Sequence, residues 1–286
     1  MQFSLRTLRL TLLLPLALMG TTACQTFRGV EMSTANALFS AEQEKALGQQ
    51  YAQQIEQEIV VLDDPEIQAW VQDMGEKLVE HSPETEQSFT FKVTTSEQVN
   101  AFAIPGGFCY VNLGLIRMAE NEAEIAAVVG HEVNHVTRRH GMRSLQRAMG
   151  IELLGTALSS DPRSATAVQL VSQAGGMVAM RSFGREDERE ADYYGVEAMY
   201  KAGWDPRGAI TFFEKLKGAE NSGEPGLFAQ IVSTHPTTTE RIENIKQQVA
   251  SYDLSTDLIL STPRFKAIQE RVAAIPRQTE GQQMPN

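Results

Sequence analysis

The first folded part of the chain has apolar residues at helical spacing, which predicts two consecutive amphipathic helices. Apolar residues recur every three or four positions after Ser40, and a second such series follows Pro65. Ser40 with Gln43 three residues later has the pattern of a capping box, and Pro65 suits the first turn of a helix. The apolar positions are Leu47, Tyr51, Ile55, Ile59 and Leu62 in the first helix and Ile67, Trp70, Val71, Met74 and Leu78 in the second.

A different pattern follows, in which apolar and polar residues alternate over short runs. Residues 89–94 alternate, residues 99–104 come next, and residues 108–112 form a third run after the turn sequence Pro105-Gly106-Gly107. Runs of this length, separated by a turn, are typical of β-strands. The sequence therefore predicts a small antiparallel sheet in this region.

Helical spacing returns after the sheet and continues to the end of the chain. Asn121 is a suitable N-cap for the next helix, and Gly141 is expected to mark its end or a bend. Residues 144–180 are apolar but interrupted, and predict two amphipathic helices that are too short to span a membrane. Further helices are expected over 186–202, 206–217, 239–252 and 264–275. The predicted fold class is α+β, mainly helical with a small antiparallel sheet.

The N-terminal segment has the layout of a bacterial secretory signal peptide. Arg6 and Arg9 precede an apolar run of about ten residues, which is too short for a permanent membrane helix. The residues before Cys24 resemble a lipobox, although Thr21 stands where such motifs usually have leucine. Cleavage there would leave Cys24 as a lipidated N-terminus. We predict a periplasmic protein with a lipid anchor and no transmembrane helix in the mature chain; the alternative is plain secretion.

Two further residues refine this interpretation. Gln25, rather than aspartate, follows the cysteine, which is compatible with the outer membrane. With Cys24 lipidated, Cys109 is the one remaining thiol, so no intramolecular disulfide is expected. The formal net charge of −11 and the pI of about 5.0 exclude nucleic acid as a partner, because no basic stripe is present to neutralise phosphates.

The predicted helix after Asn121 contains the pattern HExxH, at His131-Glu132-Val133-Asn134-His135. At about 100° of rotation per residue, the two histidines point only about 40° apart, so both can bind one Zn²⁺. Neutral imidazole is a preferred zinc ligand, and catalytic zinc sites keep one position open for water. Glu132 lies beside that face of the helix, where it can take a proton from the water as general base.

A zinc site of this kind needs a third protein ligand. The metzincin pattern is absent, because Gly141 occupies the position of its third histidine. His140, nine residues after His131, would project about 180° away on the same helix, so we expect a structural role, with an acidic partner. Acidic residues after Arg185 are better candidates. Glu188 and Asp192 share one helix face, but Glu186 and Glu190 are also four residues apart, so spacing alone leaves the choice open.

The HExxH pattern followed by Glu188-Arg189-Glu190-Ala191-Asp192 resembles peptidase family M48, the gluzincins of the CAAX-prenyl-protease type. The resemblance covers residues 40–252 and includes Asn100–Gly107, similar to a strand at the edge of the family's cleft, Ala202–Pro206, and Ser233–Pro236 with Arg241. It implies a zincin-like fold, Glu188 as the third zinc ligand and Asp192 as its supporting partner. The membrane helices of the prenyl proteases are missing, which removes prenylated substrates.

His235 in the Ser233–Pro236 motif has three possible roles. It can hydrogen-bond the oxyanion of the tetrahedral intermediate, occupy the fourth position of zinc and hold the enzyme latent, or simply cap a helix. We keep it as a candidate catalytic residue beside Glu132, with His131, His135 and Glu188 as the ligands of one Zn²⁺ per chain.

These observations together predict a zinc endopeptidase of the bacterial cell envelope. The resemblance to the soluble periplasmic lipoprotein proteases of the family implies unfolded or misassembled envelope proteins as substrates, and hence a role in protein quality control. The alternative is a zinc-bound envelope chaperone or assembly factor with latent peptidase activity. We divide the chain into a signal peptide (1–23), a lipid-anchor linker (24–40), a zinc metallopeptidase domain (41–260) and a C-terminal helix with a polar tail (261–286).

Overall fold

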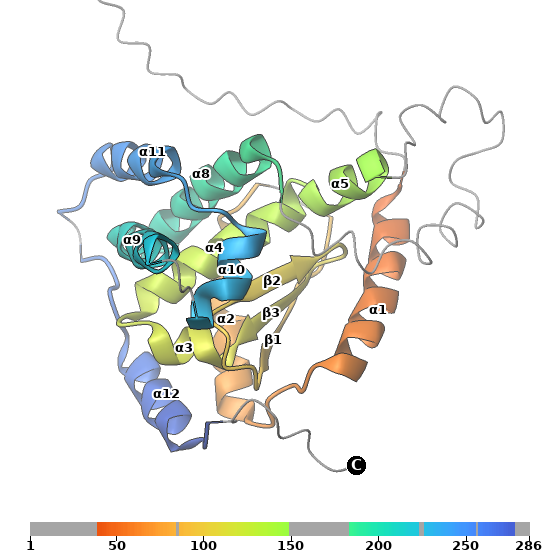
Figure 1. Cartoon of the computed structure of the whole chain (residues 1–286), viewed down its shortest axis with the longest axis horizontal. Coiled ribbons are helices and arrows are strands. Elements are labelled where there is room, and N and C mark those ends of the chain that lie inside the picture. Colours follow the sequence, from red (N-terminus) through yellow and green to blue (C-terminus); the bar gives the residue numbers. More distant parts are fainter. Residues whose placement is uncertain (1–38, 84–85, 149–182, 223–225, 256, 278–286) are drawn as a thin grey trace, which may run out of the picture. The chain divides into compact units, whose positions relative to one another are not determined.

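A three-stranded sheet lies between two groups of helices in the part of the chain that the computed structural model describes, which is residues 39–83, 86–148, 183–222, 226–255 and 257–277 (Figure 1). The predicted signal peptide, Cys24, nearly all of the linker and most of the segment 144–180 lie outside these residues. The elements are α1 (Ala41–Glu58), α2 (Pro65–Glu80), β1 (Thr90–Thr94), β2 (Ala101–Ile104), β3 (Phe108–Asn112), α3 (Leu113–Met118), α4 (Glu122–Thr137), α5 (His140–Ala148), α8 (Arg185–Lys201), α9 (Arg207–Asn221), η2 (Gly226–Phe228), α10 (Ala229–Thr234), α11 (Thr239–Ala250) and α12 (Pro263–Ala274).

The helix starts expected from the sequence are confirmed by their caps. The Ser40 hydroxyl accepts a hydrogen bond from the backbone N–H of Gln43, and the Gln43 side chain accepts one from Ser40 in return. Pro65 is in the first turn of α2, and the Asn121 side chain accepts from the Glu124 N–H at 3.0 Å. These local bonds satisfy N–H groups that have no partner within the helix. The short helices α3 and α10 were not expected, because neither has room for a full apolar period.

The sheet is mixed, which corrects one part of the fold prediction. The mainly helical α+β class is confirmed, but the strand order is β1-β3-β2, with β2 antiparallel and β1 parallel to β3. Gly106 and Gly107, with φ of 85° and 89°, form the tight turn that makes β2 and β3 antiparallel. The alternation of side chains does not specify strand direction, so the parallel pairing of β1 was not readable from the pattern. The expected cleft-edge strand, β2, does lie at an edge of the sheet.

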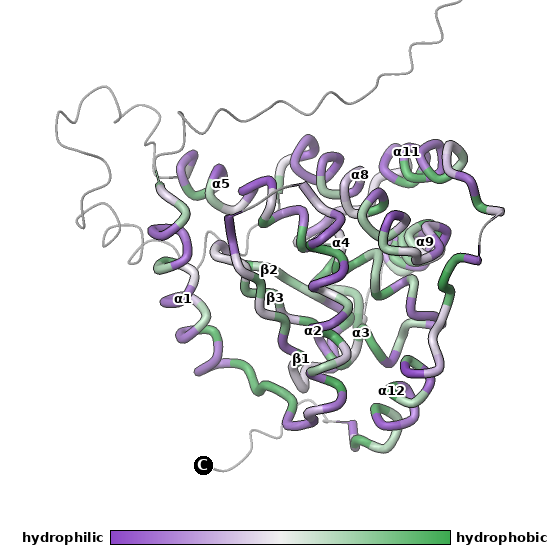
Figure 2. Tube along the Cα trace, turned by 180° about the vertical axis from the view of Figure 1, so that it is seen from behind, coloured by the Kyte–Doolittle hydropathy of each residue, from purple (hydrophilic) through white to green (hydrophobic). Residues whose placement is uncertain are grey.

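Each face of the sheet contributes to a different hydrophobic cluster. Ile104 and Tyr110 pack with Leu47 and Tyr51 of α1, in which hydrophobic and hydrophilic residues alternate along the helix (Figure 2). Strand residues that point the other way join the larger cluster formed with α2 and α4, and they include the buried free thiol of Cys109. Burial on both faces fixes the register of the strands, because a shift by one residue would exchange the two sets of side chains.

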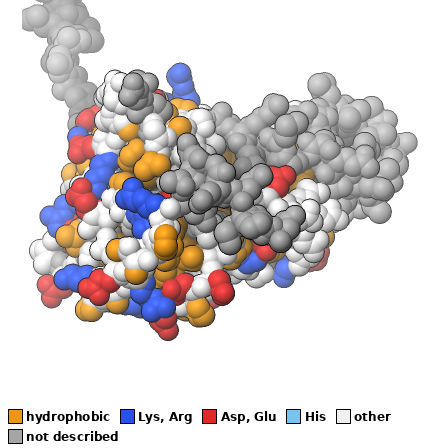
Figure 3. All heavy atoms as spheres, turned by 60° about the horizontal axis from the view of Figure 1, so that its bottom comes forward, with side chains coloured by type: hydrophobic (Ala, Val, Ile, Leu, Met, Phe, Trp, Pro, Cys, Tyr) orange, Lys and Arg blue, Asp and Glu red, His pale blue; other side chains and the backbone are white. Residues whose placement is uncertain are grey.

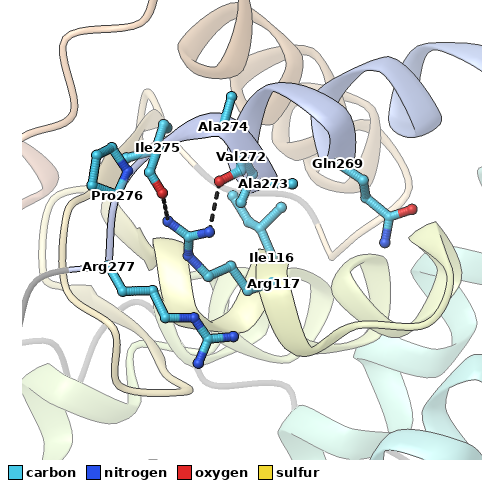
Figure 4. A pocket seen from close by; sticks show the side chains of 9 residues that line it. All are labelled: Ile116, Arg117, Gln269, Val272, Ala273, Ala274, Ile275, Pro276 and Arg277. Carbon is cyan, nitrogen blue, oxygen red and sulfur yellow. Dashed lines mark hydrogen bonds between the residues drawn. The ribbon is translucent and has the colours of Figure 1, made fainter.

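The C-terminal helix α12 packs into the larger cluster through Phe265, whose ring stacks on Trp70 with centroids 5.6 Å apart. The Arg117 guanidinium on α3 donates to the carbonyl oxygens of Val272 and Ile275 at 2.6 and 2.7 Å (Figure 4). Val272 lies in the last turn of α12 and Ile275 is its C-cap, where carbonyl oxygens have few donors within the helix. A pocket of about 400 Å³ lies beside this contact, and its lining includes no histidine.

Charged side chains of both signs are spread over the face of the molecule shown in Figure 3, with hydrophobic side chains between them. Within the described ranges, no helix combines the length and the apolar character needed to cross a membrane.

Helices α4 and α8 approach each other closely where Gly130 faces Gly195. A Cβ atom placed on Gly195 would lie 2.9 Å from the backbone nitrogen of His131 and 3.1 Å from the carbonyl carbon of Gly130. The 2.9 Å distance is shorter than real Cβ contacts, so any residue other than glycine would force the backbones of the two helices to shift. The contact determines how near the acidic residues of α8 come to the histidines of α4.

We therefore predict that Gly195→Ala destabilises the protein, because the added methyl group has to displace helix backbone. The free energy of unfolding, measured with urea, should fall by about 1–3 kcal/mol, as expected for an overpacked core. Gly218→Ala is the matched control, since nothing lies within 4 Å of its Cβ position in α9. That variant should be stabilised by about 0.5–1 kcal/mol, from helix propensity alone. Equal stability of Gly195→Ala and the unsubstituted protein would contradict the close contact.

Candidate metal centre

Helix α4 presents the two histidines of the HExxH pattern from a fully buried position. His131 and His135 are 6% and 2% exposed, and their Nε2 atoms lie 2.9 Å apart. The rings meet nearly edge to face, with an interplanar angle of 75°. Residues four apart on a helix lie on the same face, so the two nitrogens converge as the sequence predicted. Both point out of the helix toward α8 and the loop after α10.

Two more potential ligands come from other elements. The Glu188 carboxylate of α8 places Oε2 3.5 Å from His131 Nε2 and Oε1 3.5 Å from His135 Nε2. His235, at the C-cap of α10, lies with Nδ1 3.0 Å from Glu188 Oε1 and 3.3 Å from His131 Nε2. One ligand atom from each of the four residues lies within 4.8 Å of the other three. The fold thus brings together residues that are up to 104 positions apart in the sequence.

This donor set fits Zn²⁺. Imidazole nitrogen and carboxylate oxygen are its usual ligands in catalytic sites, commonly two histidines and a glutamate. Two facing imidazole nitrogens 2.9 Å apart cannot both carry a hydrogen. When neither nitrogen carries one, their lone pairs repel each other, and a cation bound by both relieves this repulsion. Burial lowers the pKa of His135 well below its usual value, and the neighbouring His131 lowers it further. The imidazole of His135 is therefore neutral, which is the form that binds metal.

The carboxylates of the centre have opposite pKa shifts. Burial raises the pKa of Glu132 above its usual value, although His235 and His131 partly oppose this. Burial also acts on Glu188, but the nearby His235 and Arg241 outweigh it and hold the pKa below its usual value. Glu188 is thus anionic, as a metal ligand must be. Glu132 instead has a proton affinity closer to that of a general base at neutral pH.

Glu132 lies between the β2 edge and the loop after α10. The backbone N–H of Ala103 on β2 donates to its carboxylate, and His235 Nε2 is 3.4 Å from Glu132 Oε1. A small cavity beside it is lined by apolar residues of three helices and by the polar side chains His131, Glu132, His235 and Arg241. Glu132 therefore lies next to both strand β2 and a small, partly apolar cavity.

The buried Arg241 holds Asp192, which is the side chain that contacts His131. Asp192 Oδ1 lies 2.9 Å from His131 Nδ1, and Arg241 of α11 donates to both Asp192 oxygens at 2.7 and 2.8 Å. The same guanidinium lies 2.8 Å from Glu188 Oε2 and donates to the Pro236 carbonyl at 3.0 Å. Burial by itself would raise the pKa of Asp192, but the contacts with Arg241 and His131 lower it to about 2. One guanidinium thus joins α8, α11 and the loop that carries His235.

The position expected for His140 is wrong, whereas its acidic partner is confirmed. Helix α4 ends at Thr137, and Arg139 with φ of 55° turns the chain into α5, which starts at His140. His140 Nδ1 therefore lies 2.8 Å from His135 Nδ1, and His140 Nε2 lies 2.9 Å from Glu190 Oε2. Helical periodicity misplaced this residue because it holds only within one continuous helix.

The contact between Phe183 and His135 was not predicted from the sequence. Its ring stacks on His135 with centroids 3.9 Å apart and an interplanar angle of 22°. A single phenylalanine in a loop before α8 gives no signal of such a contact. Of the residues that were singled out, the structure brings together His131, Glu132, His135, Glu188, Asp192 and His235, while Cys24 lies outside the described residues.

A buried helix with two histidines and an intervening glutamate, joined by a glutamate from a second helix, is the arrangement of zinc metallopeptidases, and fold and site assign the chain to this class. The sequence model of peptidase family M48 matches residues 65–249. The chain belongs to peptidase family M48, which confirms the resemblance noted in the sequence.

Three relatives have names that fit this class. The beta-barrel assembly-enhancing protease of Escherichia coli (strain K12) is 30% identical over 225 residues, which cover 76% of this chain and 46% of that protein. Metalloprotease LoiP of the same strain is 32% identical over 171 residues, covering 58% of this chain and 64% of LoiP. The mitochondrial metalloendopeptidase OMA1 of Schizosaccharomyces pombe is 33% identical over 150 residues, covering 52% of this chain and 43% of OMA1. The chain spans about half the length of the first of these relatives.

The role of Arg241 leads to a prediction about stability. Arg241→Ala leaves two buried carboxylates, those of Asp192 and Glu188, without their cation, so the free energy of unfolding of the metal-free protein should fall by about 3–5 kcal/mol. Arg189→Ala is the matched control, because Arg189 joins the same two helices through the exposed Glu240. Exposed pairs of this kind contribute about 1 kcal/mol or less. Urea titration of both variants measures the difference, and similar losses would show that Arg241 does not hold the site together.

Proposed function

We propose that the protein is a zinc-dependent endopeptidase in which His131, His135 and Glu188 bind one Zn²⁺ and Glu132 is the general base. The observation that carries this proposal is the convergence of the ligand atoms of these residues and His235 within 4.8 Å, with Glu132 beside them. Membership of a peptidase family supports the same reaction class.

The reaction follows from the positions of the side chains. When bound, Zn²⁺ supplies a Lewis acid that acidifies water and polarises the scissile carbonyl. Glu132 takes one proton from the attacking water as the oxygen adds to the carbonyl carbon. It then gives that proton to the amide nitrogen as the carbon–nitrogen bond breaks, which leaves a carboxylic acid and an amine. The raised pKa of the buried Glu132 suits both steps, because it brings the pKa of this carboxyl closer to neutral pH.

The β2 strand is the proposed docking edge for the substrate backbone. It pairs with β3 on one side, and its Ala103 N–H reaches Glu132 on the other. An extended peptide that adds to this edge would have its backbone next to the general base, as in other cases of strand addition.

The proposed location is the bacterial cell envelope, with the mature protein held at the outer membrane through a lipid on Cys24. The proposed substrates are unfolded or misassembled envelope proteins, cleaved in quality control. The sequence before Cys24 supports the anchor, and similarity to the beta-barrel assembly-enhancing protease supports an envelope substrate. Plain secretion remains the alternative for the location.

A second candidate function is a zinc-bound chaperone or assembly factor whose peptidase activity is latent. The position of His235 favours it, since its Nδ1 lies among the ligand atoms. A fourth protein ligand would occupy the position that water needs. Both functions use the same centre, and they differ in whether His235 stays there.

The first test compares proteolysis and zinc content. Wild type should degrade casein, an unfolded substrate, whereas Glu132→Gln should lose at least about 100-fold of the rate, because no carboxylate remains to move the proton. Metal analysis should give one zinc per chain for wild type and for Glu132→Gln. Glu188→Ala should lose tight zinc binding, and full retention of zinc in that variant would show that another carboxylate is the ligand. Equal inactivity of wild type and Glu132→Gln would favour the chaperone function.

The second test concerns His235. If its Nδ1 holds the fourth position of the zinc, His235→Ala opens that position, so casein hydrolysis should rise while zinc remains near one per chain. A fall of about 100-fold or more would instead assign it to the oxyanion of the transition state. His81→Ala, at the C-cap of α2 and outside the centre, is the control and should leave the rate unchanged. An unchanged rate in His235→Ala would remove this residue from the mechanism.

A further inference from the structure

Both histidines of α4 are contacted at Nδ1, the ring nitrogen that faces away from the centre, by a buried polar side chain. For His131 this side chain is Asp192, held by Arg241. For His135 it is His140, 0% exposed, whose other ring nitrogen meets Glu190. The second chain has one more member than the first, and the proposed function gives it no task.

The hydrogens of this second chain have one arrangement that leaves His135 Nε2 free for a metal. His135 must then carry its hydrogen on Nδ1, and His140 Nδ1 must accept it at 2.8 Å. A neutral His140 consequently carries its own hydrogen on Nε2 and donates it to Glu190 Oε2 at 2.9 Å. His135 donates, His140 accepts at one nitrogen and donates from the other, and Glu190 accepts, so the network is satisfied without any additional proton.

Arginines fix the far end of the chain. Arg138 lies 2.6 Å from Glu190 Oε1, and Arg143 lies 3.1 Å from Glu190 Oε2. They keep Glu190 ionised and in place, so its Oε2 can only accept a hydrogen bond. This in turn keeps the hydrogen of His140 on Nε2 and leaves Nδ1 free to accept.

The cluster of His140, Asp187 and Glu190 is not a second metal site. Its ligand atoms are close enough for one, but three arginines contact the two carboxylates. Arg143 lies 2.6 Å from Asp187 Oδ1, and Arg147 lies 3.1 Å from Asp187 Oδ2, in addition to the contacts with Glu190. Three guanidinium groups against two carboxylates leave an excess of positive charge, which repels a cation.

We propose that His140 and Glu190 are positioning residues that orient the His135 ring and keep its Nε2 free for zinc. This inference rests on the proposed function, because it requires His135 to be a ligand. Groups that hydrogen-bond to ligand histidines in this way raise their basicity, and their loss typically costs about 10–100-fold in metal affinity. A histidine–glutamate pair thus does for His135 what Asp192 does for His131.

The test measures zinc affinity of the purified protein by competition with a chromophoric chelator. His140→Leu, which keeps the volume but removes the acceptor, should bind Zn²⁺ about 10–100-fold more weakly than wild type. His140→Asn should recover part of the loss, because Asn Oδ1 occupies the place of Nδ1 and can accept from His135. In the Co²⁺-substituted protein, the ligand-field absorption of His140→Leu should shift relative to wild type, because the ring of His135 is no longer fixed.

A matched pair on α8 separates positioning from packing. Glu190→Ala and Asp187→Ala each remove one carboxylate that contacts Arg143. Glu190 Oε2 lies 2.9 Å from His140 Nε2, whereas Asp187 Oδ1 is farther away, at 4.0 Å. Glu190→Ala should weaken zinc binding, and Asp187→Ala should not. Equal losses in both would overturn the proposal in favour of a structural effect of the cluster. If His140→Leu does not fold, as judged by circular dichroism, His140→Asn and Glu190→Ala carry the test.

Failure of the inference is distinguishable from failure of the proposed function. Absence of tight zinc in wild type, or its retention in His135→Ala, would refute the proposed ligand set and the inference with it. Tight zinc in wild type that is lost in His135→Ala but unchanged in folded His140→Leu and Glu190→Ala would refute only the positioning role.

Discussion

The structure depends on the close contact of helices α4 and α8, because every candidate ligand except His235 lies on one of them. Gly130 and Gly195 face each other across this contact, and a single added Cβ would meet helix backbone at about 3 Å. A separation larger by even one methyl group would move the Glu188 carboxylate away from the two imidazoles, which it now reaches at 3.5 Å. The geometry of the centre is therefore determined by backbone packing at a site without side chains.

Burial of so much charge beside that contact requires compensation, and arginines provide it on both sides. Arg241 is the cationic partner of Asp192 and Glu188, and Arg138 and Arg143 are the cationic partners of Glu190. A buried ion pair contributes little net stability relative to apolar packing, but removal of one partner is costly. These pairs consequently act less as a source of stability than as a means of holding carboxylates, and through them imidazoles, in single orientations.

Much of the local structure was predictable, because its causes are local. The capping box at Ser40, the cap at Asn121 and the convergence of His131 and His135 follow from bonds and spacing within a few residues. Predictions failed where the cause was distant. The parallel pairing of β1 depends on a crossover between strands, and the position of His140 depends on a break in the helix at Arg139, where φ is 55°. Neither leaves a periodic signal in the sequence.

The sequence alone determined the class of chemistry: an HExxH helix, the residue types suited to zinc, and a short list of acids for the third ligand. It could not choose among those acids by spacing, since Glu188 and Glu190 are equally compatible with an exposed charged helix. The tertiary structure gives these acids different positions. It directs Glu188 toward the imidazoles and Glu190 toward His140, and it adds His235 from a loop more than one hundred residues after His131. Such assignments depend on how rigid helices pack, and that packing is set by contacts among residues far apart in the chain.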